Sequence, residues 1–134
     1  MVIDSSAVVA MFLDEPECAY FANLIAAADV RLISAVSVVE TGMLLDSRLG
    51  TDAVRDFELF LDRIRIEVVP VDHGLAWRAL AAFRRYGRGR HPAGLNLGDC
   101  FVYALAKSTG EPLLAKGNDF PQTDLSLCPA MPAQ

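Results

Sequence analysis

Short apolar runs alternate along the chain with stretches of helical periodicity. Four runs predict strands, namely Val2–Ile3, Arg31–Ile33, Glu67–Val71 and Pro112–Ala115. Between them, apolar residues recur at spacings of three and four, which predicts amphipathic helices. This alternation is typical of an α/β domain whose central sheet is largely parallel.

Polar residues and glycines mark where the predicted helices begin and end. Ser5 or Ser6 can cap the first helix, and Gly50 is suited to end the one that starts at Ser34. Together these signals predict helices over residues 7–13, 34–49, 51–64, 72–83 and 96–107, with a further helix starting near Pro16. The segment Arg84–Leu95 is rich in glycine and arginine and is predicted to be a loop.

The 134 residues suit a single domain, 1–134, with one hydrophobic core. The tail from Leu125 can add a short edge strand, and residues 128–134 are expected to be loose. The longest uncharged run, Cys18–Ala28, is too short to span a membrane, and the N-terminus has no signal-peptide pattern. A cytoplasmic protein is expected.

The overall charge argues against a protein that simply coats nucleic acid. Seventeen Asp and Glu residues outnumber twelve Lys and Arg residues, for a formal net charge of −5. A protein that wraps a phosphate backbone should be basic. An enzyme that gathers carboxylates around metal ions is not excluded by this balance.

Four acids stand where α/β proteins usually carry their chemistry. Asp4 and Asp119 lie at or just beyond strand ends, and Glu40 and Asp99 lie in first turns of predicted helices. The crevice outside the carboxyl ends of parallel strands is the usual ligand site. Carboxylates that converge there would repel one another without cations, and such oxygen ligands favour Mg²⁺ or Mn²⁺. Paired metals of this kind support phosphodiester cleavage.

Each of these acids also fits a structural role. Asp4 can accept a capping hydrogen bond from the first helix, and Asp119 suits a turn. Glu40 can form a capping box with Ser37, as Asp99 can with Asn96. A purely structural origin for all four, at one edge of the sheet, is less favoured than a shared site.

Four ordered motifs carry a family resemblance. They are Met1–Ala10, Ser37–Glu40, Leu95–Cys100 and Leu113–Phe120. In this order, and over nearly the whole chain, they resemble PIN-domain ribonucleases, and more narrowly the VapC-type toxins of prokaryotic toxin–antitoxin pairs. The resemblance implies a three-layer α/β/α sandwich and an RNA endonuclease that uses Mg²⁺ or Mn²⁺.

The resemblance also assigns roles by motif position. It gives catalysis and metal binding to an acidic quartet: Asp4, Glu40, Asp99 and Asp119. Ser6 matches a hydroxyl that supports the first aspartate, and Asn96 matches a polar residue beside the third acid. The fourth acid varies most in position within the family, so Asp124 is the alternative to Asp119.

The positive charge is concentrated late in the chain. Residues 1–83 carry six arginines against thirteen acids, whereas residues 84–134 carry six basic residues against four acids. The predicted phosphate contacts are Arg84, Arg85, Arg88, Arg90 and Lys116. Local positive charge can steer a polyanion despite an unfavourable total. The alternative is a solvated basic loop without a partner.

The resemblance implies two protein partners. VapC-type proteins are typically homodimers silenced by a VapB-type antitoxin, which places basic side chains near the acids. Two other functions stay open, a housekeeping PIN nuclease of RNA maturation and a non-catalytic interaction scaffold. Trp77, which lies among apolar residues, is predicted to pack rather than to stack on a base.

Overall fold

Four parallel strands form the centre of the molecule in the computed structural model, which describes residues 1–133. The strands are β1 (Val2–Ile3), β2 (Leu32–Ser34), β3 (Glu67–Val69) and β4 (Leu113–Leu114), in the spatial order β3-β2-β1-β4. Every neighbouring pair is parallel, so all four carboxyl ends lie at one edge of the sheet.

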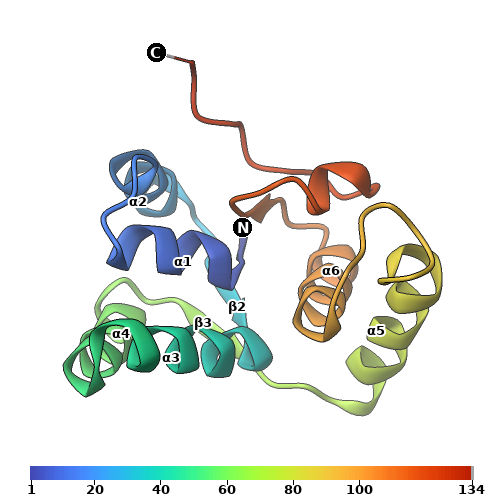
Figure 1. Ribbon diagram of the computed structural model, residues 1–134, viewed down its shortest axis with the longest axis horizontal. Helices are drawn as coiled ribbons and strands as arrows, with labels where there is room; N and C mark the ends of the chain where they lie inside the picture. Colours follow the sequence, from blue (N-terminus) through green and yellow to red (C-terminus); the bar gives the residue numbers. More distant parts are fainter. Residues whose placement is uncertain (134) are drawn as a thin grey trace.

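Helices cover both faces of this sheet. They are α1 (Ser5–Phe12), α2 (Cys18–Ala27), α3 (Ala35–Leu49), α4 (Thr51–Arg63), α5 (His73–Tyr86) and α6 (Leu97–Thr109), followed by the 3₁₀ helix η1 (Phe120–Gln122). In Figure 1, α1 to α4 lie on one side of the strands and α5 and α6 on the other. The predicted α/β/α sandwich is confirmed.

The alternation of side chains along the strands explains the two layers. Val2 and Leu113 are buried in a core shared with α5 and α6. Their neighbours Ile3 and Leu114 point to the opposite face and are buried in a second core, with side chains from α1 to α4. Successive strand residues point to opposite faces, so each two-residue strand anchors both helical layers.

The structure corrects three expectations for the middle of the chain. The third predicted strand ends at Val69, before Pro70. The helix predicted to stop at Phe83 continues to Tyr86, so Arg84 and Arg85 belong to its last turn and not to a loop. Trp77 is 58% exposed, and its Nε1 donates a hydrogen bond to His73 Nε2 at 3.0 Å, so the prediction that it packs among apolar residues is wrong.

The C-terminal segment runs beside β4. Leu127 forms an isolated parallel bridge with Leu113, and the Cys128 N–H donates to the Leu113 carbonyl at 2.8 Å. The Tyr20 hydroxyl of α2 donates to the carbonyls of Pro129 and Ala130. Residues 128–130 are therefore held against the domain and are not loose, while residue 134 lies outside the described part.

Among residues 1–133, no helix has both the length and the apolar character needed to cross a membrane.

A polar latch fixes the segment after η1 to the α5–α6 layer. The Asp124 carboxylate accepts a hydrogen bond from the Tyr103 hydroxyl and pairs with Lys107 Nζ at 2.9 Å and Arg85 Nη1 at 3.3 Å. These contacts, the Tyr103 hydrogen bond foremost, lower the pKa of Asp124 from 3.8 to about 2. The segment is thereby tied to two helices at once.

Asp124→Asn should lower the free energy of unfolding by about 1 kcal/mol near neutral pH, since the latch is partly solvent-exposed. The folded pKa lies below the unfolded value of 3.8, so the charge stabilises the fold above that pH and loses its effect as the pH falls toward 2. Urea unfolding of both proteins across this range measures the difference. Asp56→Asn is the matched control, because Asp56 is an exposed residue of α4 that forms no ion pair among the described residues. An Asp124→Asn deficit that persists unchanged at pH 2 would contradict the latch.

Candidate active site

The first acid sits directly at the end of β1. Asp4 is the N-cap of α1, and its Oδ2 accepts a hydrogen bond from the Ser6 N–H at 3.0 Å. Its own N–H donates to the Leu114 carbonyl of β4, which fixes its backbone to the sheet. Asp4 is only 4% exposed, so a carboxylate is held in a largely dry position.

Glu40 reaches the same region from α3. The N-cap of this helix is Ser34, whose hydroxyl accepts from the Val36 N–H at 3.2 Å, so the predicted capping box between Ser37 and Glu40 is wrong. The Glu40 carboxylate lies instead against the first turn of α6. It occupies the place where a side chain on Gly98 would begin.

Asp99 is held by the capping box predicted for α6. The Asn96 Oδ1 accepts from the Asp99 N–H at 2.9 Å, and the Asp99 Oδ2 accepts from the Asn96 N–H at 3.2 Å. This reciprocal pair is confirmed and fixes the carboxylate at the positive end of a helix. One carboxylate oxygen of Asp99 is left for other contacts.

The structure separates the two candidates for the fourth acid. Asp119 precedes η1 without making a side-chain capping bond, and it lines the same cleft as the other three acids. Asp124 does not line that cleft, and its carboxylate is occupied by the latch described above. The geometry therefore places Asp119, and not Asp124, with the quartet.

All four acids line one cleft of about 410 Å³ at the carboxyl edge of the sheet. Ser6, Asn96 and Lys116 line it as well, as does Glu15 from the turn after α1. Within residues 1–133, no Lys or Arg forms an ion pair with any acid of the quartet. The cleft therefore concentrates negative charge that the described part of the chain leaves uncompensated.

The pKa values report this crowding. Burial is the main cause that raises the pKa of Asp4, and it raises the pKa of Asp99 to about 6. Burial also raises the pKa of Glu40, and repulsion from Asp4 and Asp99 adds to it. The protein thus holds these carboxylates in a place where their charged forms are costly, a common property of functional sites.

The donor set fits a divalent metal ion. Carboxylate oxygens without a protein cation beside them are the ligands that Mg²⁺ and Mn²⁺ prefer. No three Asp, Glu, His or Cys side chains within the described residues converge closely enough to enclose an ion between them. Mg²⁺ is usually bound through one or two carboxylates and keeps several waters, so an open set of this kind is compatible with it.

Ser6 connects the two strands that carry Asp4 and Asp119. Its Oγ accepts a hydrogen bond from the Lys116 N–H at 2.9 Å, and a hydrogen bond from its hydroxyl lowers the pKa of Asp4 against the effect of burial. The Lys116 Nζ pairs with Glu15 at 2.9 Å and with Glu17 at 2.8 Å. Lys116 is therefore at the rim of the cleft but is already paired.

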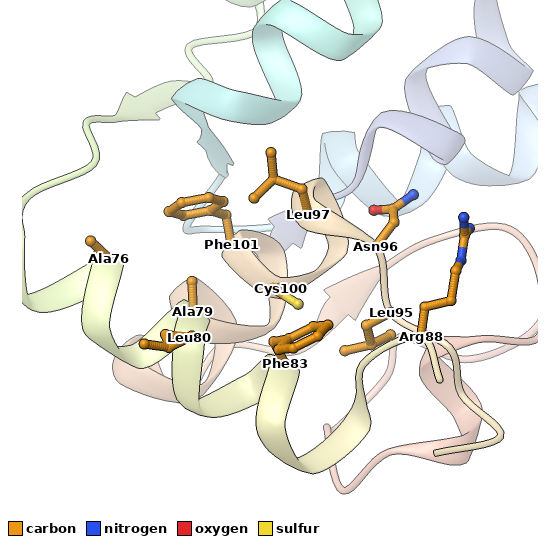
Figure 2. A pocket seen from close by; sticks show the side chains of 10 residues that line it. All are labelled: Ala76, Ala79, Leu80, Phe83, Arg88, Leu95, Asn96, Leu97, Cys100 and Phe101. Atoms are coloured by element: carbon orange, nitrogen blue, oxygen red, sulfur yellow. The ribbon is translucent and has the colours of Figure 1, made fainter. Parts of the chain in front are cut away.

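The predicted phosphate-binding arginines do not form one cluster. The charge of Arg88 is close enough to lower the pKa of Asp99, and its side chain lies beside Asn96 (Figure 2). Arg90 lies over the ring of Phe83, 5.0 Å from the centroid. Arg85 belongs to the latch, and Arg84 is exposed on the last turn of α5. Arg88 is the member of this group nearest to the acids.

Two residues that shape the cleft are missing from the sequence-based assignment. Glu15 lines the cleft and holds Lys116, yet the acidic turn around it indicates only a helix boundary. Gly98 accommodates Glu40, and a glycine within the first turn of a predicted helix is the signal that could have identified it.

Comparisons with known proteins identify the family of this chain. The profile of the PIN domain family matches residues 1–125. Ribonuclease VapC30 of Mycobacterium tuberculosis is 48% identical over 94% of this chain and 96% of its own length. Ribonuclease VapC of Mycolicibacterium smegmatis is also 48% identical, over 94% of this chain and 98% of its own. The chain therefore belongs to the PIN domain family, within its VapC ribonuclease branch.

Solved structures share the fold at low sequence identity. The crystal structure of Mycobacterium tuberculosis VapC20, a sarcin–ricin loop cleaving toxin, matches with a TM-score of 0.77 and 20% identity over 92% of this chain and 95% of its own. A toxin–antitoxin complex from Klebsiella pneumoniae matches with a TM-score of 0.74 and 17% identity, over 96% and 97% of the two chains. These likenesses support the fold assignment.

The contact between Glu40 and Gly98 predicts how two similar substitutions differ. Alanine favours a helix over glycine by up to about 1 kcal/mol. Gly42→Ala on α3 meets no neighbouring atom and should stabilise the protein, whereas Gly98→Ala must displace the Glu40 carboxylate and should stabilise it less. Chemical unfolding of the two variants measures the difference. The deficit of Gly98→Ala should disappear in a Glu40→Ala background; equal stabilisation by both alanines in the presence of Glu40 would contradict the contact.

Proposed function

We propose that this chain is a metal-dependent RNA endonuclease and the toxin of a toxin–antitoxin pair. The observation that carries the proposal is a quartet of carboxylates that lines one cleft without a cation partner in residues 1–133. Relatives named as VapC ribonucleases cover almost the whole chain and support the same function.

The residues have distinct roles in this proposal. Asp4, Asp99 and Asp119 hold Mg²⁺ or Mn²⁺ directly or through water, and Glu40 binds metal or orients the attacking water. When bound, the metal lowers the pKa of a water and stabilises the charge that develops on the phosphate oxygens. Ser6 keeps Asp4 oriented and ties it to the chain before Asp119, while Asn96 fixes Asp99 through the capping box.

A non-catalytic scaffold explains less of what is observed. Capping accounts for Asp4 and Asp99, which both accept hydrogen bonds from helix N-termini. It does not account for Glu40, which caps no helix, or for Asp119, whose side chain makes no capping bond. The acids at these two positions are explained by a shared ligand.

The same cleft and one helix face suit the expected protein partners. A VapB-type antitoxin that inserts an Arg or Lys side chain would compensate the negative charge and compete with metal.

Val39 and Met43, 60% and 66% exposed on the outer face of α3, offer an apolar surface to a second copy of the chain. Because a toxin of this class would act on cellular RNA, a cytoplasmic location is part of the proposal. An antitoxin reading frame beside the gene separates the toxin from a housekeeping PIN nuclease.

Asparagine substitutions test the acid assignment. Asp4→Asn and Asp119→Asn should each reduce RNA cleavage by at least about 100-fold, since each removes a charged ligand. Asp124→Asn should retain most of the activity at a temperature well below its unfolding midpoint. Excess EDTA should abolish cleavage by the wild type, and added Mg²⁺ or Mn²⁺ should restore it. Loss of activity in Asp124→Asn but not in Asp119→Asn would reverse the choice of fourth acid, and full activity in EDTA would refute metal dependence.

Arg88 should contribute one phosphate contact. The variant Arg88→Ala is made in a protein that also carries Asp4→Asn, so that the RNA is not cleaved. It should weaken RNA binding and reduce the slope of the logarithm of the binding constant against the logarithm of the salt concentration by about one. Fluorescence anisotropy with a short labelled RNA at several salt concentrations measures both. Arg63→Ala, an exposed arginine at the end of α4, is the control and should leave the slope unchanged. The same slope in both variants would mean that Arg88 is an ordinary surface charge.

A further inference from the structure

An open apolar groove of about 470 Å³ lies between α5 and α6 on the side of the sheet opposite α1. Its walls are formed mainly by Leu80, Phe83, Leu95, Leu97, Cys100 and Phe101. Figure 2 shows these side chains gathered around one space, with the ring of Phe83 beside Cys100. Apolar surface that stays open to water is costly, and a groove of this kind is a typical ligand site.

The groove and the acidic cleft have one lining residue in common. Asn96 lines both of them, and Arg88 lines the groove while its charge acts on Asp99. In Figure 2, these two polar side chains stand at the same end of the groove and point in the same direction. A molecule that occupied both the cleft and the groove would therefore pass Asn96.

The polar end of the groove has unused donors. The Asn96 Oδ1 accepts the capping bond from Asp99, but its amide nitrogen has no hydrogen-bond partner among residues 1–133. The Arg88 guanidinium likewise forms no ion pair within this part of the chain. The rest of the groove is lined by apolar side chains and the Cys100 thiol.

We propose that the groove binds one unstacked nucleobase of the RNA substrate, next to the phosphate that is cleaved. The proposal rests on the function proposed above. A base has an apolar aromatic face that suits Phe83 and Phe101, and polar edges that suit the Asn96 amide. The phosphate attached to it suits Arg88. Single-stranded RNA is commonly recognised in this way, by bases that stack on aromatic side chains and pair through their edges.

Charge complementarity favours RNA over a protein segment as the occupant. The open donors at the polar end and the nearby guanidinium of Arg90 call for an acceptor-rich, negatively charged ligand. An aliphatic peptide side chain would fill the apolar part but leave these donors unpaired. The groove would then contribute sequence selectivity, whereas the quartet would contribute cleavage.

A filled groove provides the test. Ala76 lines the groove from the exposed side of α5, and Ala81 lies on the same helix outside it. Ala76→Phe should reduce discrimination among RNAs that differ at one nucleotide beside the cleaved bond, measured as a ratio of kcat/KM values, by about tenfold. Ala81→Phe should leave that ratio unchanged. Leu97→Ala, which removes a wall side chain that is 76% exposed, should also reduce the ratio without loss of folding.

A binding measurement separates this proposal from the proposed function. NMR titration of the Asp4→Asn protein with AMP, GMP, CMP and UMP should shift signals of Leu80, Leu97 and Phe83, and Ala76→Phe should abolish the shifts. Absence of RNA cleavage by the wild type would refute the proposed function, while these shifts would still support a base site. Unchanged selectivity in Ala76→Phe would overturn the proposal. It would also be overturned if Ala76→Phe changed only the oligomeric state in sedimentation, which would make the groove an interface between copies.

Discussion

Burial of neighbouring carboxylates at one edge of the sheet, to which their mutual repulsion adds, is the constraint around which this structure is organised. Because every strand is parallel, the chain leaves β1, β2 and β4 at the same edge and carries an acid there or shortly afterwards. Burial raises the pKa of Asp4 and Asp99, so the fold holds charges where they are unfavourable. Such an arrangement persists only where the surrounding structure determines it fully.

Hydrogen bonds from backbone N–H groups hold these acids in place. Asp4 is fixed by its N–H bond to β4 and by the N–H of Ser6, and Asp99 by its reciprocal pair with Asn96. These bonds use some carboxylate oxygens and leave others facing the cleft. A capping role at these positions is therefore compatible with the proposed catalytic role, since the hydrogen bonds that start the helices also orient the acids.

The sequence predicts the layers, and it predicts that the four acids lie in one cleft, because both depend on local signals. Short apolar strands followed by polar caps are recognisable from spacing alone, and so are the acids beside them. Helix boundaries were less accurate. Ser34 and Ser37 are both suitable caps, and only the pairing of Ser34 with Val69 between β2 and β3 keeps the first of them extended. Arg84 and Arg85 were assigned to a loop by composition, although arginine is a good helix former.

Contacts between distant segments could not be predicted in this way. The distinction between Asp119 and Asp124 depends on Tyr103, Lys107 and Arg85, which approach Asp124 only in the folded chain. The position of the Glu40 carboxylate against Gly98 likewise depends on how α3 and α6 pack. In both cases the residue types are visible in the sequence, but their partners are determined by tertiary structure.

Contacts formed only in the folded chain also explain how an acidic protein can present a surface for RNA. Pairing with acids removes Arg85, Lys107 and Lys116 from the count of free positive charges. Arg88 forms no ion pair within residues 1–133, and it lines the apolar groove together with the neutral Asn96 amide. In the proposed binding mode, affinity for a polyanion would depend on a few donors placed beside the reacting phosphate and on apolar contact with a base. A net charge of −5 is compatible with this arrangement because most of the acids lie elsewhere on the fold.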